Sequence, residues 1–275
     1  MSCKTILTYC DAEGRSDERL AAAITVARYF DAHLTVLGMG YEADMPVYAM
    51  GDVVGPAIVE IADQARALSI ARADAARDAL AIGGVLGDAE PQVCSYGAMA
   101  RQFGGHARFC DLAVLTRPYG DDVPGTAESA MDGALLDGDA PVLICPDGMD
   151  GFDPRTVLIA WNNSREALRA VRRAMPILER AETIEIALFD PSPADMGPAE
   201  QLAALLSRQG LSVEIAEHVR GSGPISASIA TRTREMGADL LVMGAYGKSR
   251  FREYVLGGVT RDLLSAPPVP ILLAC

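Results

Sequence analysis

The residues best suited to carry chemistry lie near the C-terminus, between Asp239 and Thr260. A continuous apolar run, Leu240 to Met243, ends at Gly244, and three more glycines follow: Gly247, Gly257 and Gly258. Such a run is typical of a buried parallel strand, and glycines let backbone N–H groups approach a ligand closely. A helix starting at the last two glycines would add unpaired N–H donors. The stretch predicts a phosphate cradle, although ordinary turn chemistry explains the same spacing equally well.

Three cations, Lys248, Arg250 and Arg252, alternate inside this glycine loop. They are either the solvated face of a loop or the partners of a small polyanion. The rest of the chain is acidic, with a formal net charge of −13 and a pI of about 4.7. A field of that sign repels a nucleic-acid backbone, so we expect no nucleic acid as a partner.

Other kinds of chemistry find little support in the sequence. The six cysteines form no CxxC pair and there are only three histidines, which argues against a zinc site. The serines lack a nucleophile elbow, and His218, near the end of an expected strand, has a structural role as its simpler interpretation. We therefore expect no catalytic residues and no metal ligands.

Composition predicts a globular protein of about two domains. The chain has 275 residues, of which 50% are hydrophobic, and its mean hydropathy is +0.16. No apolar run reaches the roughly 18 residues of a membrane span, and the N-terminus does not resemble a secretory signal. Cysteines without pairing motifs fit core packing in a reducing compartment. We expect a cytoplasmic protein with no membrane contact.

Strand and helix patterns alternate along the whole chain, which predicts parallel sheets covered on both faces. A loop or lid, rich in glycine and proline, is expected from Tyr41 to Pro56 before a long helix. The strands expected are 4–10, 34–40, 92–95, 112–116, 142–145, 156–161, 184–189, 212–217, 239–243 and 270–273. The helices expected between them are 15–30, 57–82, 98–109, 128–136, 166–180, 199–208 and 225–236.

The pattern of the first half begins again after the polar segment Pro146 to Pro154. CDLAVLTRPYG from Cys110 matches ADLLVMGAYG from Ala238, and APVLICP from Ala140 matches VPILLAC from Val269. The chain is therefore interpreted as a tandem duplication of one α/β unit, with domains at residues 1–147 and 154–275.

The Gly-x2-Gly-x9-Gly spacing, placed after a fourth strand and before a last helix and strand, resembles the universal stress protein family over essentially the whole chain. The resemblance implies two adenine-nucleotide alpha-hydrolase-like, Rossmann-like domains, each a doubly wound, mostly parallel five-stranded sheet, paired through their last strands. It also implies ATP or AMP at the carboxyl ends of strands one and four of the second domain, in agreement with the rule for open α/β sheets. The cofactor-binding residues implied are Ala160, Trp161, Asn162, Phe189, Met243, Gly244, Gly247, Gly257, Gly258, Val259 and Thr260.

Two positions of the second domain depart from the family pattern. Gly258 stands where the motif usually has Ser or Thr, with Thr260 as a partial replacement. Asn162 stands where the first strand usually ends in Asp, and an amide is a weaker ligand than a carboxylate for a hard cation. A role for Mg²⁺ is left open. Trp161 is interpreted as a core filler or as a stacking surface for the ligand.

The first domain departs further. Its loop has Arg117 and Pro118 at the first glycine position, and Asp121 and Asp122 replace the cations. Asp11 ends the first strand as the family's acid does, but without an intact cradle it is interpreted as a surviving trace or a helix cap. We expect no nucleotide in this half.

Three functions compete at this point. The first is a stress-response regulator that binds an adenine nucleotide in the second domain. The second is a structural or interaction module in which the duplication acts as an internal dimer, and the third is a slow ATPase. Intact glycine spacing favours the first over the second, and the absence of a general base favours either over the third. The protein partner is unknown, and the whole chain can pair again into a homodimer.

Overall fold

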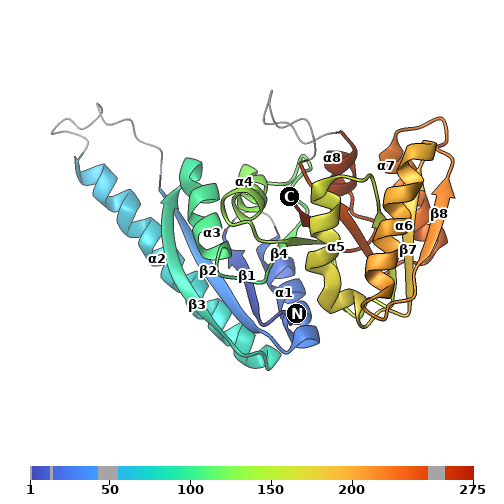
Figure 1. Cartoon of the computed structure of the whole chain (residues 1–275). Coiled ribbons are helices and arrows are strands. Elements are labelled where there is room, and N and C mark those ends of the chain that lie inside the picture. Colours follow the sequence, from blue (N-terminus) through green and yellow to red (C-terminus); the bar gives the residue numbers. More distant parts are fainter. Residues whose placement is uncertain (1, 13–14, 43–54, 247–257) are drawn as a thin grey trace. The chain divides into compact units, whose positions relative to one another are not determined.

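The computed structural model describes residues 2–12, 15–42, 55–246 and 258–275, with backbone only for 55–58. By its contacts the chain divides into two units, coloured along the sequence in Figure 1. The N-terminal unit comprises Cys3–Ala140 with Gly148–Gly151, and the C-terminal unit comprises Pro141–Asp147 with Phe152–Cys275.

The N-terminal unit is a parallel sheet with the strand order β3-β2-β1-β4. Right-handed crossovers place α1 and α2 on one face and α3 and α4 on the other (Figure 1). Its elements are β1 (Thr5–Cys10), α1 (Ser16–Phe30), β2 (His33–Glu42), α2 (Gly55–Gly83), β3 (Gly87–Ser95), α3 (Met99–Ala107), β4 (Leu112–Thr116) and α4 (Gly125–Asp132), which a π turn at Gly133–Asp137 continues.

The C-terminal unit holds the strands in the order β5-β10-β9-β6-β7-β8. All its pairings are parallel except that of β5 with β10, where Leu143 lies opposite Leu272 in an antiparallel register. Its elements are β5 (Val142–Cys145), β6 (Thr156–Ala160), α5 (Arg165–Leu178), β7 (Thr183–Phe189), α6 (Pro193–Ser207), β8 (Glu214–His218), α7 (Ile225–Glu235), β9 (Leu240–Gly244), α8 (Gly258–Ser265) and β10 (Ile271–Ala274).

The central strands are apolar on both faces because helices cover both faces. Residues of β4, β5, β9 and β10 are buried almost throughout, whereas β8, at the end of the strand order, alternates between exposed and half-buried positions. Five strands come from each half of the described sequence, and the two last strands, β5 and β10, pair with one another as predicted.

Most predicted elements are confirmed, and the differences lie where polar residues hide a pattern. β3 begins at Gly87 rather than at the predicted Gln92. The sequence pattern missed its first residues because they are polar and include Pro91, which a strand at the end of a sheet tolerates. α6 begins at Pro193 rather than Ala199, with a capping box between Ser192 and Asp195. Of the predicted loop Tyr41–Pro56, the ends belong to β2 and α2, and residues 43–54 lie outside the described residues.

Small residues let α2 lie directly on β2. A Cβ atom built on Gly38 would lie 2.6 Å from the backbone nitrogen of Ala73, and one built on Gly40 would overlap the carbonyl oxygen of Ala65. Neither backbone group can move without breaking a helical hydrogen bond, so these glycines are required by packing.

We expect Gly40→Ala to destabilise the protein by about 1–3 kcal/mol, because the added methyl group forces α2 away from the sheet. Urea-unfolding midpoints followed by circular dichroism measure the change. Gly105→Ala is the matched control, since Gly105 lies within α3 and a Cβ there meets no atom. It should leave stability unchanged or raise it by up to about 1 kcal/mol; equal effects of the two substitutions would contradict the packing role of Gly40.

Candidate functional site

The carboxyl ends of β6, β9 and β7 meet at one edge of the C-terminal unit. Ala160 is in register with Met243 on one side and with Ala187 on the other. The N–H of Trp161 donates to the carbonyl oxygen of Ala187 at 3.0 Å, which continues the ladder past the end of β6. The chain leaves β6 toward β7 and leaves β9 toward β10, so the strand order reverses between β6 and β9. Open α/β sheets bind ligands at such a switch point.

Asn162 lies at this switch point and shapes the start of α5. Its Oδ1 accepts a hydrogen bond from the N–H of Ser164 at 3.2 Å, and the hydroxyl of Ser164 caps the helix by accepting from the N–H of Ala167 at 3.1 Å. The Asn162 side chain is exposed, and its Nδ2 has no partner among the described residues. The amide therefore presents two donors to solvent beside the N-terminus of α5.

Gly244 owes its identity to packing inside the protein. A Cβ atom at this position would lie 2.5 Å from the backbone nitrogen of Ala167 and 2.8 Å from the carbonyl carbon of Glu166. The absence of a side chain thus lets β9 approach the first turn of α5. Gly244 therefore brings β9 and α5 together at the candidate site.

Gly258 differs from Gly244 in this respect. It is the first residue of α8, it is exposed, and a Cβ atom built on it meets no atom of the described residues. Val259 is half-buried and Thr260 is buried in the same first turn of α8. Among the described residues, nothing covers Gly258 or gives a packing reason for glycine there. Gly247 and Gly257, with the cations Lys248, Arg250 and Arg252, lie outside the described residues.

Trp161 and Phe189 complete the predicted set. Trp161 is only 7% exposed, which fits the core-filling interpretation better than a stacking surface. Its indole Nε1 is buried, and in the part of the chain that the structure describes it has no hydrogen-bond partner. Phe189, at the end of β7, is half-buried with its ring centroid 5.3 Å from that of His218.

His218 has the structural surroundings that the sequence suggested. Its Nε2 lies 2.8 Å from Oε1 of Glu185, a buried carboxylate that also pairs with Arg232. Burial raises the pKa of Glu185, but the hydrogen bonds from Arg232 and His218 outweigh it and leave the pKa below its ordinary value. The three groups satisfy one another at the β7–β8 side of the sheet, away from the switch point between β6 and β9.

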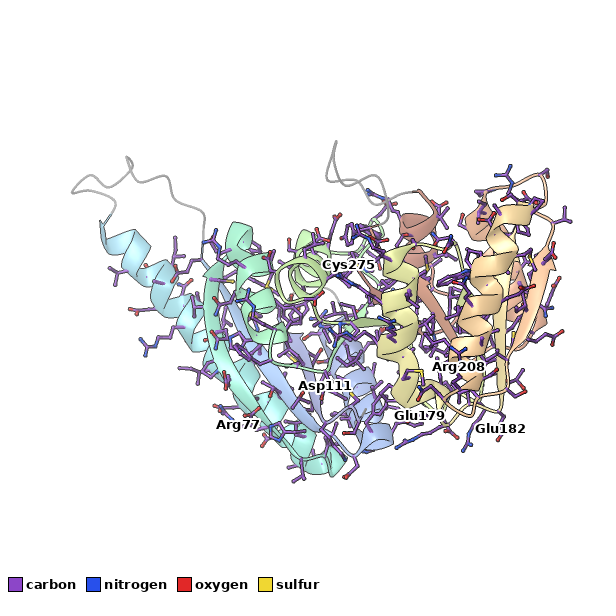
Figure 2. The ribbon with its side chains drawn as sticks, viewed as in Figure 1. Arg77, Asp111, Glu179, Glu182, Arg208 and Cys275 are labelled. Carbon is purple, nitrogen blue, oxygen red and sulfur yellow. The ribbon has the colours of Figure 1, made fainter. Side chains whose placement is uncertain are left out.

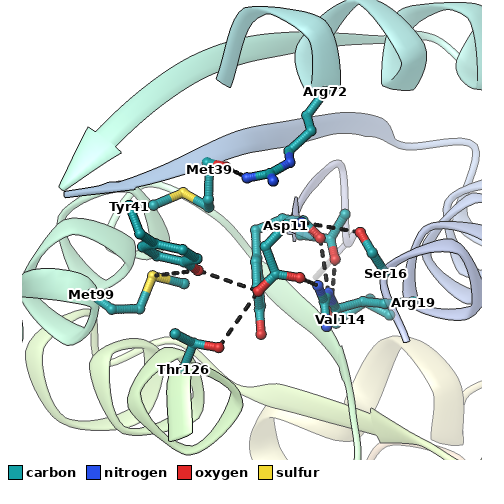
Figure 3. A network of polar contacts seen from close by, with 11 residues as sticks. Asp11, Ser16, Arg19, Met39, Tyr41, Arg72, Met99, Val114 and Thr126 are labelled. Atoms are coloured by element: carbon teal, nitrogen blue, oxygen red, sulfur yellow. Dashed lines mark hydrogen bonds and ion pairs between the residues drawn. The ribbon is translucent and has the colours of Figure 1, made fainter. Parts of the chain in front are cut away.

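The corresponding edge of the N-terminal unit is closed by the chain itself (Figure 3). Asp11, 5% exposed, pairs with Nη2 of Arg19 at 2.8 Å, and Arg19 is 2% exposed. Nε of Arg19 donates to the carbonyl oxygen of Tyr9 at 2.8 Å, and the guanidinium lies 3.6 Å over the Tyr9 ring. The hydroxyls of Tyr41 and Thr126 donate to the other Asp11 oxygen at 3.3 and 3.5 Å. Both oxygens of the Asp11 carboxylate therefore already have partners within the protein.

This network rules out the helix-cap interpretation of Asp11. It also contains Arg19, a residue whose role was not predicted from the sequence. Asp11 does not cap α1, because the N-cap is Arg15 and makes no side-chain capping bond. Arg19 was not singled out from the sequence, yet it fills the position beside the acid that ends the first strand. Its helical spacing within an otherwise apolar face of α1 was the available signal.

Asp122, in the acidic loop after β4, is paired with two arginines. Asp122 accepts hydrogen bonds from Arg117 and Arg15, and those bonds lower the pKa of Asp122 to about 2. Among the described residues, no cluster of three His, Cys, Asp or Glu side chains could hold a metal ion. No described helix has the length and apolar character needed to cross a bilayer.

We expect Arg19→Met to cost about 3–5 kcal/mol of stability, because it leaves the Asp11 carboxylate buried without its counter-charge. Asp11→Asn with Arg19→Met should cost less than Arg19→Met alone, since no unpaired ion remains. Denaturant unfolding of the two single variants and the double variant measures this coupling. Arg172→Met, on the exposed side of α5, is the control; a loss in Arg19→Met no larger than in this control would contradict a buried, uncompensated charge.

Comparison with known proteins was made once this geometry was established. Residues 154–274 match the universal stress protein family. No curated protein sequence matched the chain. The fold resembles that of a universal stress protein from Archaeoglobus fulgidus DSM 4304, with a TM-score of 0.71 and 16% identity over 98% of this chain and 97% of that chain.

A functionally unknown protein from Pseudomonas aeruginosa PAO1 is similar with a TM-score of 0.57 and 15% identity, over 99% of this chain and 92% of that chain. At such identities the likeness shows a shared fold. A universal stress protein in complex with cAMP aligns with 45% of this chain and 99% of its own, at a TM-score of 0.37 and 20% identity. Residues 154–274 of the chain therefore form a domain of the universal stress protein family.

Proposed function

We propose that the C-terminal unit binds an adenine nucleotide, ATP or AMP, at the carboxyl ends of β6 and β9, and that the chain acts as a stress-response regulator. The observation that carries the proposal is the contrast between the two corresponding edges. In the N-terminal unit a buried arginine neutralises the acid that ends the first strand. In the C-terminal unit Asn162 and Gly258 are both exposed, the Nδ2 of Asn162 has no partner among the described residues, and a Cβ atom built on Gly258 meets none of them.

The open groups at the C-terminal edge suit a nucleotide. The first N–H groups of α8, beginning at Gly258, are donors for phosphate oxygens, and the helix dipole adds to their attraction. The amide of Asn162 can donate to a ribose hydroxyl or a phosphate oxygen. Binding at one edge only, in the second domain, is part of this proposal.

Binding without efficient turnover follows from the same residues. An amide cannot serve as a general base, and Asn162 stands where the family's acid would be. It is also a poor ligand for Mg²⁺, so the proposal is nucleotide binding that does not depend on a metal. A cytoplasmic location belongs to the proposal as well, because all six cysteines are free thiols.

A structural or interaction module is the second candidate. The observation that favours it is the antiparallel pairing of β5 with β10, which joins the last strands of the two halves and protects strand edges that would otherwise be available to other chains. In that function the duplicated sequence acts as an internal dimer, and the partner is a protein.

We expect Gly258→Leu to weaken ATP and AMP binding by at least about tenfold, measured by isothermal titration calorimetry. The leucine side chain meets open space in the protein, so it should leave the fold intact while it fills the room that phosphates need. Gly125→Leu is the matched control, because Gly125 begins α4 of the N-terminal unit with equally open space around it. If the wild-type protein bound no adenine nucleotide at millimolar concentration, the interaction module would replace this proposal.

We expect Asn162→Asp to make nucleotide affinity depend on Mg²⁺. A carboxylate oxygen can keep the hydrogen bond from the N–H of Ser164, so the variant changes charge while preserving the start of α5. Without Mg²⁺ the new charge should weaken ATP binding, and with Mg²⁺ the binding should recover. Titrations of both proteins with and without Mg²⁺ measure the difference, and the same response to Mg²⁺ in both would contradict a role for Asn162.

A further inference from the structure

A groove of about 550 Å³ lies between α5 and α6 of the C-terminal unit. Its lining comes from the start of α5, between Trp161 and Leu168, and from α6, between Pro198 and Arg208. The stretch of α6 that lines it covers ten residue steps, which corresponds to a length of roughly 15 Å. Grooves of this volume hold ligands the size of a small organic molecule.

The walls of the groove are apolar and partly exposed. Leu168 on α5 and Leu205 and Pro198 on α6 are all half-buried, in contrast to their fully covered neighbour Leu206. Apolar surface left in contact with water is unfavourable by about 25 cal/mol for each Å². A ligand with an apolar body would remove that surface from water.

The groove carries positive charge in an acidic protein. Arg165 and Arg208 line it, both are exposed, and neither has an ion-pair partner among the described residues. The lining contains no Asp or Glu, although the chain as a whole has a net charge of −13. Figure 2 shows Arg208 at one end of α6. Arg165 is the first residue of α5, where the helix dipole also favours a negative charge.

One polar group at the Arg165 end is left unsatisfied. Trp161 lines the groove, and its buried Nε1 has no hydrogen-bond partner among the described residues. A buried N–H without an acceptor costs about 1–3 kcal/mol. A small rotation of the indole toward an acceptor bound beside Arg165 would recover that cost.

We propose that this groove binds a small amphipathic anion, a medium-chain aliphatic carboxylate, with the carboxylate at Arg165 and Trp161 and the chain along Leu168 and Leu205. The aliphatic class follows from walls of leucine and proline, because the Trp161 ring is too covered to offer a stacking face. The negative head group follows from two unpaired arginines and the helix N-terminus. This site involves α6 and does not include Gly258, so it does not rest on nucleotide binding.

Trp161 allows a direct test, because it is the only tryptophan in the chain. Dodecanoate, below its micelle concentration, should change the Trp161 fluorescence in a saturable way and give a matching binding isotherm by calorimetry. Dodecyltrimethylammonium, with the same chain and the opposite charge, should bind at least about tenfold more weakly. Equal binding of both probes would overturn the proposal, since it would mean non-specific adsorption of the alkyl chain.

Charge-reversal variants locate the head group. Arg165→Glu should weaken dodecanoate binding by at least about tenfold and Arg208→Glu by less, because only Arg165 lies at the helix N-terminus beside Trp161. Arg172→Glu, on the same helix but outside the groove, should bind like the wild type. Equal losses in Arg165→Glu and Arg172→Glu would overturn the placement. Gly258→Leu should retain dodecanoate binding. A failure of the nucleotide-binding proposal is therefore distinguishable from a failure of the carboxylate-binding proposal.

Discussion

The parallel hydrogen-bond ladder between β6 and β9 is the interaction on which the rest of the C-terminal unit depends. Because both strands are apolar on both faces, they are stable only with helices above and below, and these helices must return the chain to the same edge each time. The carboxyl ends of the parallel strands β6, β7, β8, β9 and β10 therefore gather at one edge, where α5 follows β6. The site is a consequence of satisfying the backbone of buried strands.

The two halves show two outcomes at this edge. In the N-terminal unit, Asp11 is retained but its charge is balanced internally by Arg19, whose guanidinium also covers Tyr9 and binds its carbonyl oxygen. Removing either partner of a buried ion pair is strongly destabilising, because the other charge is left buried alone. The pair therefore has a structural role at that edge. In the C-terminal unit the acid is replaced by Asn162, which carries no charge to be balanced and stays at the surface. The charged group at the N-terminal edge is thus buried and paired, whereas Asn162 at the C-terminal edge is exposed among the described residues.

The glycines of the site do not all serve the same purpose. Gly244 is required where β9 approaches the first turn of α5, as Gly40 is required where β2 approaches α2. Gly258 has open space around it among the described residues, so its lack of a side chain leaves the backbone accessible. The groove between α5 and α6 resembles Gly258 in this respect. Apolar side chains remain partly exposed there, beside two arginines that have no ion-pair partner among the described residues. Ligand sites are indicated where side chains leave room that the fold does not need.

The sequence by itself determined the strands and helices, their parallel arrangement and the duplication, because apolar runs, helical periodicity and repeated strand ends are local signals of burial. It also predicted a site at the ends of β6 and β9 that includes Gly244 and Asn162, since strand ends in a doubly wound sheet share an edge. Only the tertiary structure decided that Arg19 occupies the space beside Asp11, that Gly244 serves packing while Gly258 is open, and that α5 and α6 enclose a cationic groove. Those facts depend on distances between residues far apart in sequence, which no local pattern encodes.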